Sequence, residues 1–217
     1  MYRILQLLTD AEVAECKQIA ASTQFVDGRI TNPHNKAKQN EQLHDANAYQ
    51  KSSQLLQQAF ARSEEFHEFA FPVRIAPPMM TRYKPGMKYG AHADSAFIKL
   101  PQGAIRSDLS STVFLNDPAD YDGGELKVRL GDSELTFKLK PGEAIVYPSD
   151  SLHQVMPVTR GERLVGITFI QSRIQDPFRR SLLFELNEVA ALEGLKMDPE
   201  NFGRLQLVQQ NLLRHWS

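Results

Sequence analysis

The most constraining feature of the sequence is its central stretch, over about 71–175, in which short apolar runs are separated by proline and glycine turns. Within the runs apolar and polar residues alternate, as they do in a strand that buries one face. Turn sequences such as Asp122-Gly123-Gly124 and Pro141-Gly142 separate several runs. Short strands at this spacing predict an antiparallel sandwich or barrel, a group that includes the double-sheet jelly roll. The predicted strands are 79–83, 111–115, 125–130, 135–139, 144–147 and 164–170.

Helical patterns flank this central stretch on both sides. Near the N-terminus a short apolar segment predicts a strand, and Thr9 followed by Glu12 has the form of a capping box that opens a helix. The polar segment from Thr31 to Gln42 predicts an exposed loop. Further helices are predicted over 46–65, 178–195 and 202–216.

Composition narrows the class of protein and the partners to expect. The 217 residues are 41% hydrophobic and 24% charged, which is typical of a globular chain and excludes collagen, a coiled coil and a disordered chain. The net charge of -1 provides no overall attraction to nucleic acid or an acidic membrane. The single cysteine, Cys16, cannot form an intramolecular disulfide, and its helical spacing predicts a core position. A lone thiol and the lack of a signal-like start predict a cytoplasmic protein.

Two of the six histidines lie where they would share a site. Alternate residues of a strand point the same way, so His92 and Asp94 would both face the inside of a barrel. His153, which follows the strand predicted over 144–147, would supply a third group from a distant part of the sequence. Two imidazoles and one carboxylate on one face, with open positions, form the ligand set of non-haem Fe(II) oxygenases. A histidine in an ordinary hydrogen-bonded position and a hydrolytic zinc site are the alternatives.

Arg163 stands ten residues after His153, at the start of the apolar run 164–170. A guanidinium buried there needs an anionic partner. Its forked N–H groups suit the distal carboxylate of a dicarboxylic co-substrate, or alternatively a protein carboxylate at the strand end. A hydrolytic zinc site would give Arg163 no role.

Several motifs occur in order along the chain and are highly specific when taken together. They resemble the Fe(II)- and 2-oxoglutarate-dependent dioxygenases of the prolyl-hydroxylase type, and most closely the bacterial PKHD-type hydroxylase family. The resemblance covers essentially the whole chain. The motifs are Arg82-Tyr83, Tyr89, His92-x-Asp94, Phe114-Leu115-Asn116, Asp122-Gly123-Gly124-Glu125-Leu126, Lys140-Pro141-Gly142, Tyr147-Pro148, His153-x-Val155 and Arg163.

This resemblance implies an α+β fold and a division of the chain. The expected core is a double-stranded β-helix, or jelly roll, over about 71–175, supported by N-terminal helices. The dioxygenase domain would span 1–175, and 176–217 would form a small helical C-terminal extension.

The resemblance also implies a role for each site residue. His92, Asp94 and His153 would hold the catalytic Fe(II), Arg163 would bind the C5 carboxylate of the co-substrate 2-oxoglutarate, and Tyr83 would donate a hydrogen bond to the same carboxylate. Tyr89 would line the mouth of the barrel. Dioxygen would be consumed, with ascorbate as a reductant, and an unidentified small molecule or peptide side chain would be hydroxylated, with a link to iron and siderophore uptake.

Other functions are alternatives to a hydroxylase of this type. Nucleic-acid demethylases of the same superfamily have a second arginine six residues after the first, where this chain has Phe169. A non-catalytic, cupin-like metal-binding sensor or interaction module would bind metal without decarboxylating a co-substrate. The segments 34–42 and 99–106 are predicted lids. The apolar face of the last helix, with Leu205 and Trp216, would cap the barrel or form a homodimer contact.

Overall fold

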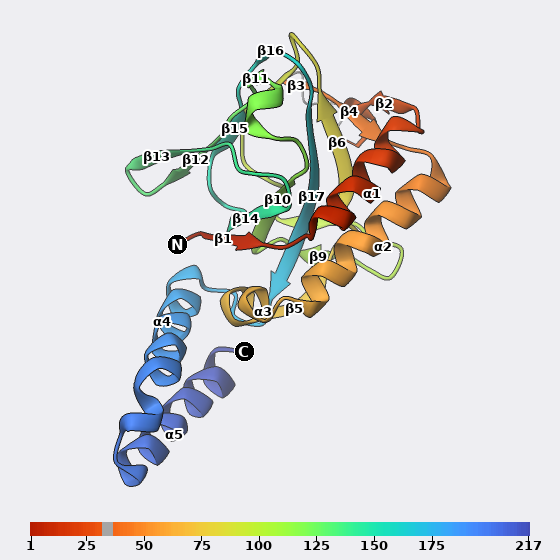
Figure 1. Cartoon of the computed structure of the whole chain (residues 1–217). Coiled ribbons are helices and arrows are strands. Elements are labelled where there is room, and N and C mark those ends of the chain that lie inside the picture. The colour runs from red at the N-terminus through yellow and green to blue at the C-terminus, as the bar shows by residue number, and fades with distance from the viewer. Residues whose placement is uncertain (32–36) are drawn as a thin grey trace.

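The computed structural model describes residues 1–31 and 37–217, which form two antiparallel sheets flanked by helices (Figure 1). Within these residues the larger sheet has eight strands in the order β1-β14-β10-β17-β6-β4-β2, and its eighth strand, β5, pairs with β17. Its strands are β1 (Arg3–Gln6), β2 (Phe25–Asp27), β4 (Glu41–Leu43), β5 (Pro72–Ile75), β6 (Met79–Tyr83), β10 (Leu109–Phe114), β14 (Glu143–Pro148) and β17 (Arg163–Ser172).

The smaller sheet has the order β13-β12-β15-β7-β3, and two further strand pairs extend the framework. Every strand pairing in the described part of the chain is antiparallel, which confirms the expected mixture of helices and antiparallel sheets. The strands of the smaller sheet are β3 (Lys38–Gln39), β7 (Lys88–His92), β12 (Leu126–Leu130), β13 (Ser133–Phe137) and β15 (His153–Val155). The additional pairs are β8 (Phe97–Ile98) with β9 (Ile105–Arg106), and β11 (Asp122–Gly123) with β16 (Val158–Arg160).

The larger sheet buries both of its faces, and its side chains alternate between two apolar clusters. On β10, Val113 lies in the cluster shared with the helices, while Phe114 lies in the cluster that joins the two sheets. On β17, Leu164 and Val165 divide in the same way. This alternation follows from the period of two along a strand. Both faces of the larger sheet, which carries Ser110 and Arg163 of the site described below, are therefore packed.

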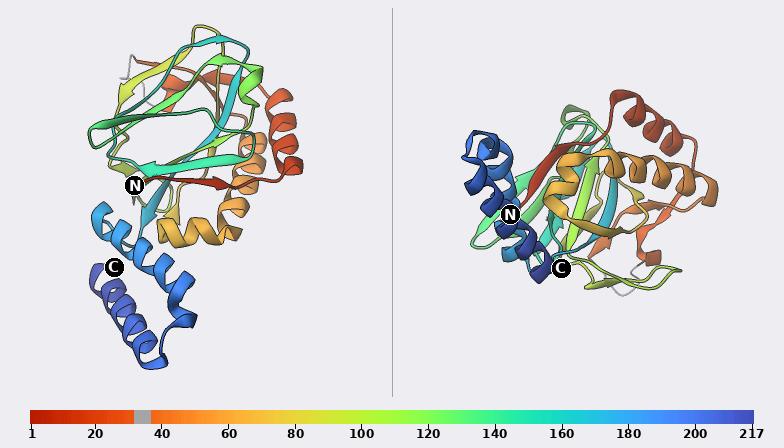
Figure 2. Two further views of the ribbon diagram at one scale, coloured as in Figure 1. Left: turned by 60° about the vertical axis from the view of Figure 1, so that its left-hand side comes forward. Right: turned by 90° about the horizontal axis from the view of Figure 1, so that it is seen from below.

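Three helices from the N-terminal part of the chain support the larger sheet (Figures 1 and 2). They are α1 (Asp10–Ala21), α2 (Ala46–Arg62) and α3 (Glu64–Ala70). The predicted capping box is confirmed, since Thr9 and Glu12 exchange hydrogen bonds at the start of α1. Cys16 is buried as predicted, and burial raises the pKa of its thiol to about 12.

The sequence predicted the apolar strands better than it predicted the break between two helices and the short polar strands. Each of the six predicted strands matches an observed one to within two residues at both ends. The single helix expected over 46–65 is instead broken at Ser63, whose backbone is extended and whose hydroxyl caps α3 by accepting from the Phe66 N–H. The loop expected over 31–42 is wrong for its described part after residue 36, because β3 and β4 pair there with neighbouring strands.

The C-terminal residues form a pair of helices that projects from the sheets (Figure 2). These are α4 (Pro177–Glu193) and α5 (Pro199–Trp216). α4 is anchored through Phe184, whose ring packs edge-on against Phe69 of α3 at 5.5 Å between centroids. α5 packs against α4, and all of it lies in the described part, where none of its residues is buried. No helix in the described residues is long and apolar enough to span a bilayer.

Candidate metal centre

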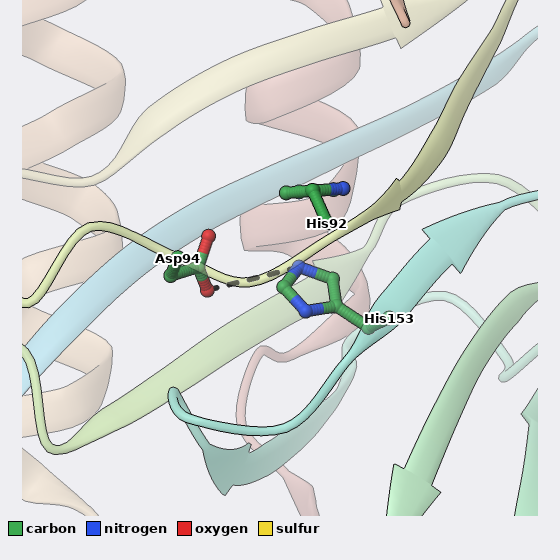
Figure 3. Close-up of side chains that lie close together, drawn as sticks. All are labelled: His92, Asp94 and His153. Carbon is green, nitrogen blue, oxygen red and sulfur yellow. Dashed lines mark ion pairs between the residues drawn. The ribbon is translucent and has the colours of Figure 1, made fainter.

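His92, Asp94 and His153 converge at one point between the sheets (Figure 3). One ligand atom from each of these residues lies within 4.8 Å of the others. His153 Nε2 and Asp94 Oδ2 are 3.7 Å apart, and the two imidazole centroids are 4.2 Å apart. Two ligands that are each about 2.1 Å from one ion lie about 3 Å apart at a right angle, so a small inward movement would close this set on a metal. The predicted grouping of these three residues is therefore present.

The position of Asp94 relative to the strand that carries His92 differs from the expected one. His92 is the last residue of β7 and lies directly opposite His153, the first residue of β15, in adjacent strands of the smaller sheet. Asp94 lies beyond the end of β7, so the expectation that His92 and Asp94 share one strand is wrong. The chain leaves the ladder after His92, and this frees Asp94 to turn toward the histidines (Figure 3).

A one-residue bulge sets the direction of His92. Between the two aligned pairs, β15 advances from His153 to Val155 while β7 runs three residues, from His92 to Tyr89. Residues three apart in a regular strand point to opposite faces, but the extra residue brings Tyr89 and His92 to the same side. Their rings stack at 3.6 Å between centroids with 15° between the planes. The bulge therefore aims His92 at the site and supports its ring.

Backbone carbonyls fix the proton on each histidine. His92 Nδ1 lies 2.8 Å from the Gly90 carbonyl oxygen, and His153 Nδ1 lies 3.0 Å from that of Ser151. A carbonyl only accepts, so each Nδ1 carries the proton and each Nε2 presents a lone pair. Burial, and then the neighbouring His153, lower the pKa of His92 to about 4, so its imidazole is neutral near pH 7. Neutral imidazoles with a free Nε2 are ready to bind a metal.

A chain of serines holds the third group and was not found by sequence reasoning. Ser110 on β10 donates to Asp94 Oδ2 at 2.5 Å, and its oxygen lies 2.7 Å from Ser149 Oγ. Ser107 in turn donates to Ser149 at 2.8 Å. The sequence gives no signal for these residues, because Ser149 lies 42 and 39 residues from Ser107 and Ser110 and serine is common in loops.

Arg163 is buried, with 2% of its surface exposed, and it has no ion pair with any described carboxylate. Its Nε has no hydrogen-bond partner among the described residues. The guanidinium carbon lies 5.1 Å from the centroid of the Tyr83 ring and 5.4 Å from that of Phe114. Burial lowers the pKa of this guanidinium, although arginine stays protonated at neutral pH. A buried cation without a carboxylate partner is costly and is a place for an anionic ligand.

The alternative partner at the strand end does not bind Arg163. Glu162 lies 4.0 Å from the guanidinium of Arg82, which also pairs with Glu41. The adjacent Glu162 carboxylate is thus directed to another arginine, and Arg163 is left without an ion-pair partner among the described residues.

Tyr83 lies opposite Arg163 in the pairing of β6 with β17. Its hydroxyl accepts a hydrogen bond from Asn40 Nδ2 at 3.0 Å, and burial raises the pKa of this phenol. A hydroxyl that accepts one bond keeps its own proton to donate. Asn40 was missed by sequence reasoning because it lies in the segment that was expected to be a loop.

Comparison with known proteins agrees with this geometry. Residues 78–171 match the family model of the 2OG-Fe(II) oxygenase superfamily. A PKHD-type hydroxylase of Sphingopyxis alaskensis is 60% identical over 216 residues, covering 100% of this chain and 99% of that protein. A PKHD-type hydroxylase of Nitrobacter winogradskyi is 40% identical, and the match covers 99% of this chain and 97% of that protein. The chain belongs to the PKHD-type hydroxylases.

Solved structures show the same fold at lower sequence identity. A prolyl-4-hydroxylase of Pseudomonas putida gives a TM-score of 0.56 with 20% identity over 79% of this chain and 92% of its own. A prolyl hydroxylase of Trichoplax adhaerens gives 0.59 with 15% identity over 83% of this chain and 86% of its own. This PKHD-type hydroxylase is therefore an Fe(II)- and 2-oxoglutarate-dependent enzyme, as its sequence indicated, and the non-catalytic sensor is not favoured.

Replacing Ser110 with alanine is expected to weaken metal binding. The change removes the hydrogen bond that orients Asp94, and losing such a supporting bond lowers metal affinity by about 10- to 100-fold. Competition with a chromophoric chelator for Mn(II) measures the effect. Ser111→Ala is the matched control, since Ser111 is also buried on β10 but its hydroxyl has no partner among the described residues. Equal affinities of the two variants would contradict the role of Ser110.

Proposed function

We propose that His92, Asp94 and His153 are the metal ligands of this hydroxylase and that Arg163 binds the distal carboxylate of 2-oxoglutarate. The observation that carries the proposal is the buried guanidinium of Arg163, which has no ion pair with a described carboxylate and lies in the same interior as the three ligand side chains. Tyr147 connects the two parts, because its ring contacts His153 edge-on and the charges of both Asp94 and Arg163 act on its phenol. A dicarboxylic co-substrate would bridge the same two parts.

Each residue has a separate task in this proposal. The histidines supply Nε2 lone pairs whose direction is fixed by their Nδ1 hydrogen bonds, and Asp94 supplies the carboxylate that offsets part of the ion's charge. Arg163 binds and orients the distal carboxylate, with Tyr83 donating its hydroxyl proton to the same group. Bound together, Fe(II) and 2-oxoglutarate supply the activation of dioxygen, with oxidative decarboxylation of the co-substrate and hydroxylation of a substrate C–H bond.

We assign the two sheets to a jelly roll, in which the metal site lies between the smaller and the larger sheet. The cluster that joins the sheets, together with the structural neighbours of the same fold, supports this assignment. The boundary near residue 175, the use of ascorbate, the cytoplasmic location and the link to iron and siderophore uptake stay predictions. Neighbours of this fold are described in complex with a peptide fragment or with hygromycin B, so either class of substrate fits the fold.

The two segments predicted as lids, 34–42 and 99–106, form different structures. Residues 34–36 of the first lie outside the described residues, and most of the remainder of that segment belongs to β3 and β4. The second, over 99–106, is the loop of the β8–β9 hairpin and ends in β9. We propose only the second as a segment that closes over the site.

Anaerobic titration with Fe(II) and 2-oxoglutarate tests the ligand assignment. We expect a visible charge-transfer band in the wild-type protein, no band in His153→Ala, and about 10- to 100-fold weaker 2-oxoglutarate binding in Arg163→Ala, because a charge-assisted bond is lost. Arg160→Ala is the control, since Arg160 is exposed and pairs with Asp122. A folded wild-type protein without the band would contradict the proposal.

Gly124 offers a more selective test of Arg163. Its φ is +68°, and a Cβ added there would lie 3.1 Å from Arg163 Cδ and 2.9 Å from Val158 Cγ2. Gly124→Ala is therefore expected to displace the guanidinium and weaken 2-oxoglutarate binding several-fold, while Mn(II) affinity stays close to wild type. Gly131→Ala is the matched control, because Gly131 also has a positive φ, of +61°, but has nothing within 4 Å of the added Cβ. Equal 2-oxoglutarate affinity in both variants, measured by calorimetry, would contradict this role of the contact.

We also propose that a second copy of the chain covers the outer face of α4, rather than the face of the last helix expected from the sequence, whose Leu205 and Trp216 are half-buried. Apolar side chains on this helix recur at 178, 182, 189 and 192, which fall on one side at 100° per residue, and all four are exposed. Light scattering after size exclusion should give twice the 24.6 kDa of the chain for the wild type and the monomer mass for Val189→Glu. A wild-type monomer, or an unchanged dimer in the variant, would exclude this interface.

A further inference from the structure

A pocket of about 650 Å³ lies on the Asp94 side of the metal centre. Its wall is built from three parts of the chain that are far apart in sequence: the β8–β9 hairpin, the loop after β14, and the two C-terminal helices. Asp94 and Ser149 line the pocket, so it reaches both the carboxylate ligand and the serine chain that holds it. Its volume lies in the range of small-molecule sites, which is about 300 to 1,000 Å³.

Two arginines at the start of α4 line this pocket without an ion-pair partner among the described carboxylates. Arg180 has only 4% of its surface exposed, and its Nη1 donates to the Ile174 carbonyl at 2.9 Å and the Gln175 carbonyl at 3.4 Å. Its Nε and Nη2 have no hydrogen-bond partner in the described part of the chain. Arg179 lies beside it at the same helix start. Arg180 is thus a buried cation with donors left over for a ligand.

The acidic groups of the pocket are largely engaged elsewhere. Asp108 forms a two-point ion pair with Arg106, and Asp176 caps α4 by accepting from the Arg179 N–H at 2.8 Å. The charges of Asp108, Asp150 and Asp176 act on Arg180 from a distance. Once Asp94 is assigned to the metal, Asp150 is the only acidic residue of the pocket without a hydrogen bond or ion pair in the described chain, whereas two arginines there have no ion-pair partner among the described residues.

Aromatic rings form the apolar part of the wall. Trp216, the only tryptophan of the chain, lies at the end of α5, and the Arg179 guanidinium carbon is 5.8 Å from its ring centroid. Phe97 on β8 also lines the pocket, although 63% of its surface is exposed. A ring next to a cation suits a ligand that carries both a flat apolar surface and an anionic group.

We propose that this pocket is the substrate site and that it takes a small aromatic carboxylate. The carboxylate binds Arg179 and Arg180, the ring packs on Trp216, and the substrate extends toward Asp94. This inference rests on the proposed function, because the metal at Asp94 is what makes the pocket a reaction site. It gives the C-terminal helices a role in substrate binding rather than only in assembly.

The test uses Trp216 as its own reporter, because the chain holds no other tryptophan. The full-length protein, loaded with Mn(II) and 2-oxoglutarate, is titrated with benzoate, phenylacetate and 3-phenylpropionate up to about 10 mM, which covers weak affinities. The matching amides are titrated in parallel. We expect at least one carboxylate to change the Trp216 emission saturably, and its amide to bind about tenfold more weakly or not at all.

Variants separate this pocket from non-specific binding. Arg179→Gln should weaken carboxylate binding about tenfold, the loss expected for one charge-assisted bond. Arg204→Gln is the control, since Arg204 lies on the same helix as Trp216 but is exposed, pairs with Glu200 and does not line the pocket. Circular dichroism shows whether both variants are folded.

The outcomes distinguish this inference from the proposed function. If no carboxylate alters the emission, if amides bind as tightly as acids, or if Arg179→Gln binds as tightly as Arg204→Gln, the substrate class is wrong even when the Fe(II) and 2-oxoglutarate band forms normally. If the band fails to form while carboxylates still bind at Trp216, the pocket is a ligand site and the metal assignment is wrong. Saturable, Arg179-dependent binding in a protein that also forms the band supports both.

Discussion

The one-residue bulge in β7 is the constraint on which the site depends. It brings Tyr89 and His92 to the same side of the strand, and it places His92 opposite His153 at the end of the ladder. A regular strand would send one of these rings to the other face of the sheet. Because the ladder ends at His92, the next residues are free to bring Asp94 back toward the two imidazoles. The two sheets, which are joined by an apolar cluster, support the metal centre between them.

Charge balance explains why the interior is arranged as it is. Burial lowers the pKa of the His92 imidazole, backbone carbonyls accept the Nδ1 protons of both histidines, and Asp94 beside them is held by Ser110 rather than by a cation. The cation of the same interior, Arg163, is kept away from the nearby Glu162, which is directed to Arg82. Among the described residues Asp94 therefore lacks a positive partner, and Arg163 lacks a negative one. A divalent ion and a dicarboxylate supply these opposite charges, and Fe(II) and 2-oxoglutarate are the metal and co-substrate of the oxygenase superfamily to which the chain belongs.

The sequence predicted what has a repeating pattern and missed what depends on distant parts of the chain. Six strands and the capping box at Thr9 follow from periodicity and residue type, and all are present. The grouping of His92, Asp94 and His153 is present too, although Asp94 does not lie on the strand that it was expected to share with His92. Ser110 and Asn40 could not be predicted, because their roles come from hydrogen bonds across 16 and 43 residues. The polar strands β3 and β4 were missed since they are stabilised by strand pairing rather than by an apolar pattern. The pocket arises where the last helices meet a hairpin loop, a contact that sequence patterns do not encode.

A crystal structure of the protein grown anaerobically with Mn(II) and 2-oxoglutarate tests the central claim most directly. Anomalous scattering locates the ion, and the density locates the co-substrate. The account predicts one ion bound by His92 Nε2, His153 Nε2 and an Asp94 oxygen, with the far carboxylate of 2-oxoglutarate on the Arg163 guanidinium. An ion bound elsewhere, or a co-substrate whose far carboxylate lies away from Arg163, would contradict it.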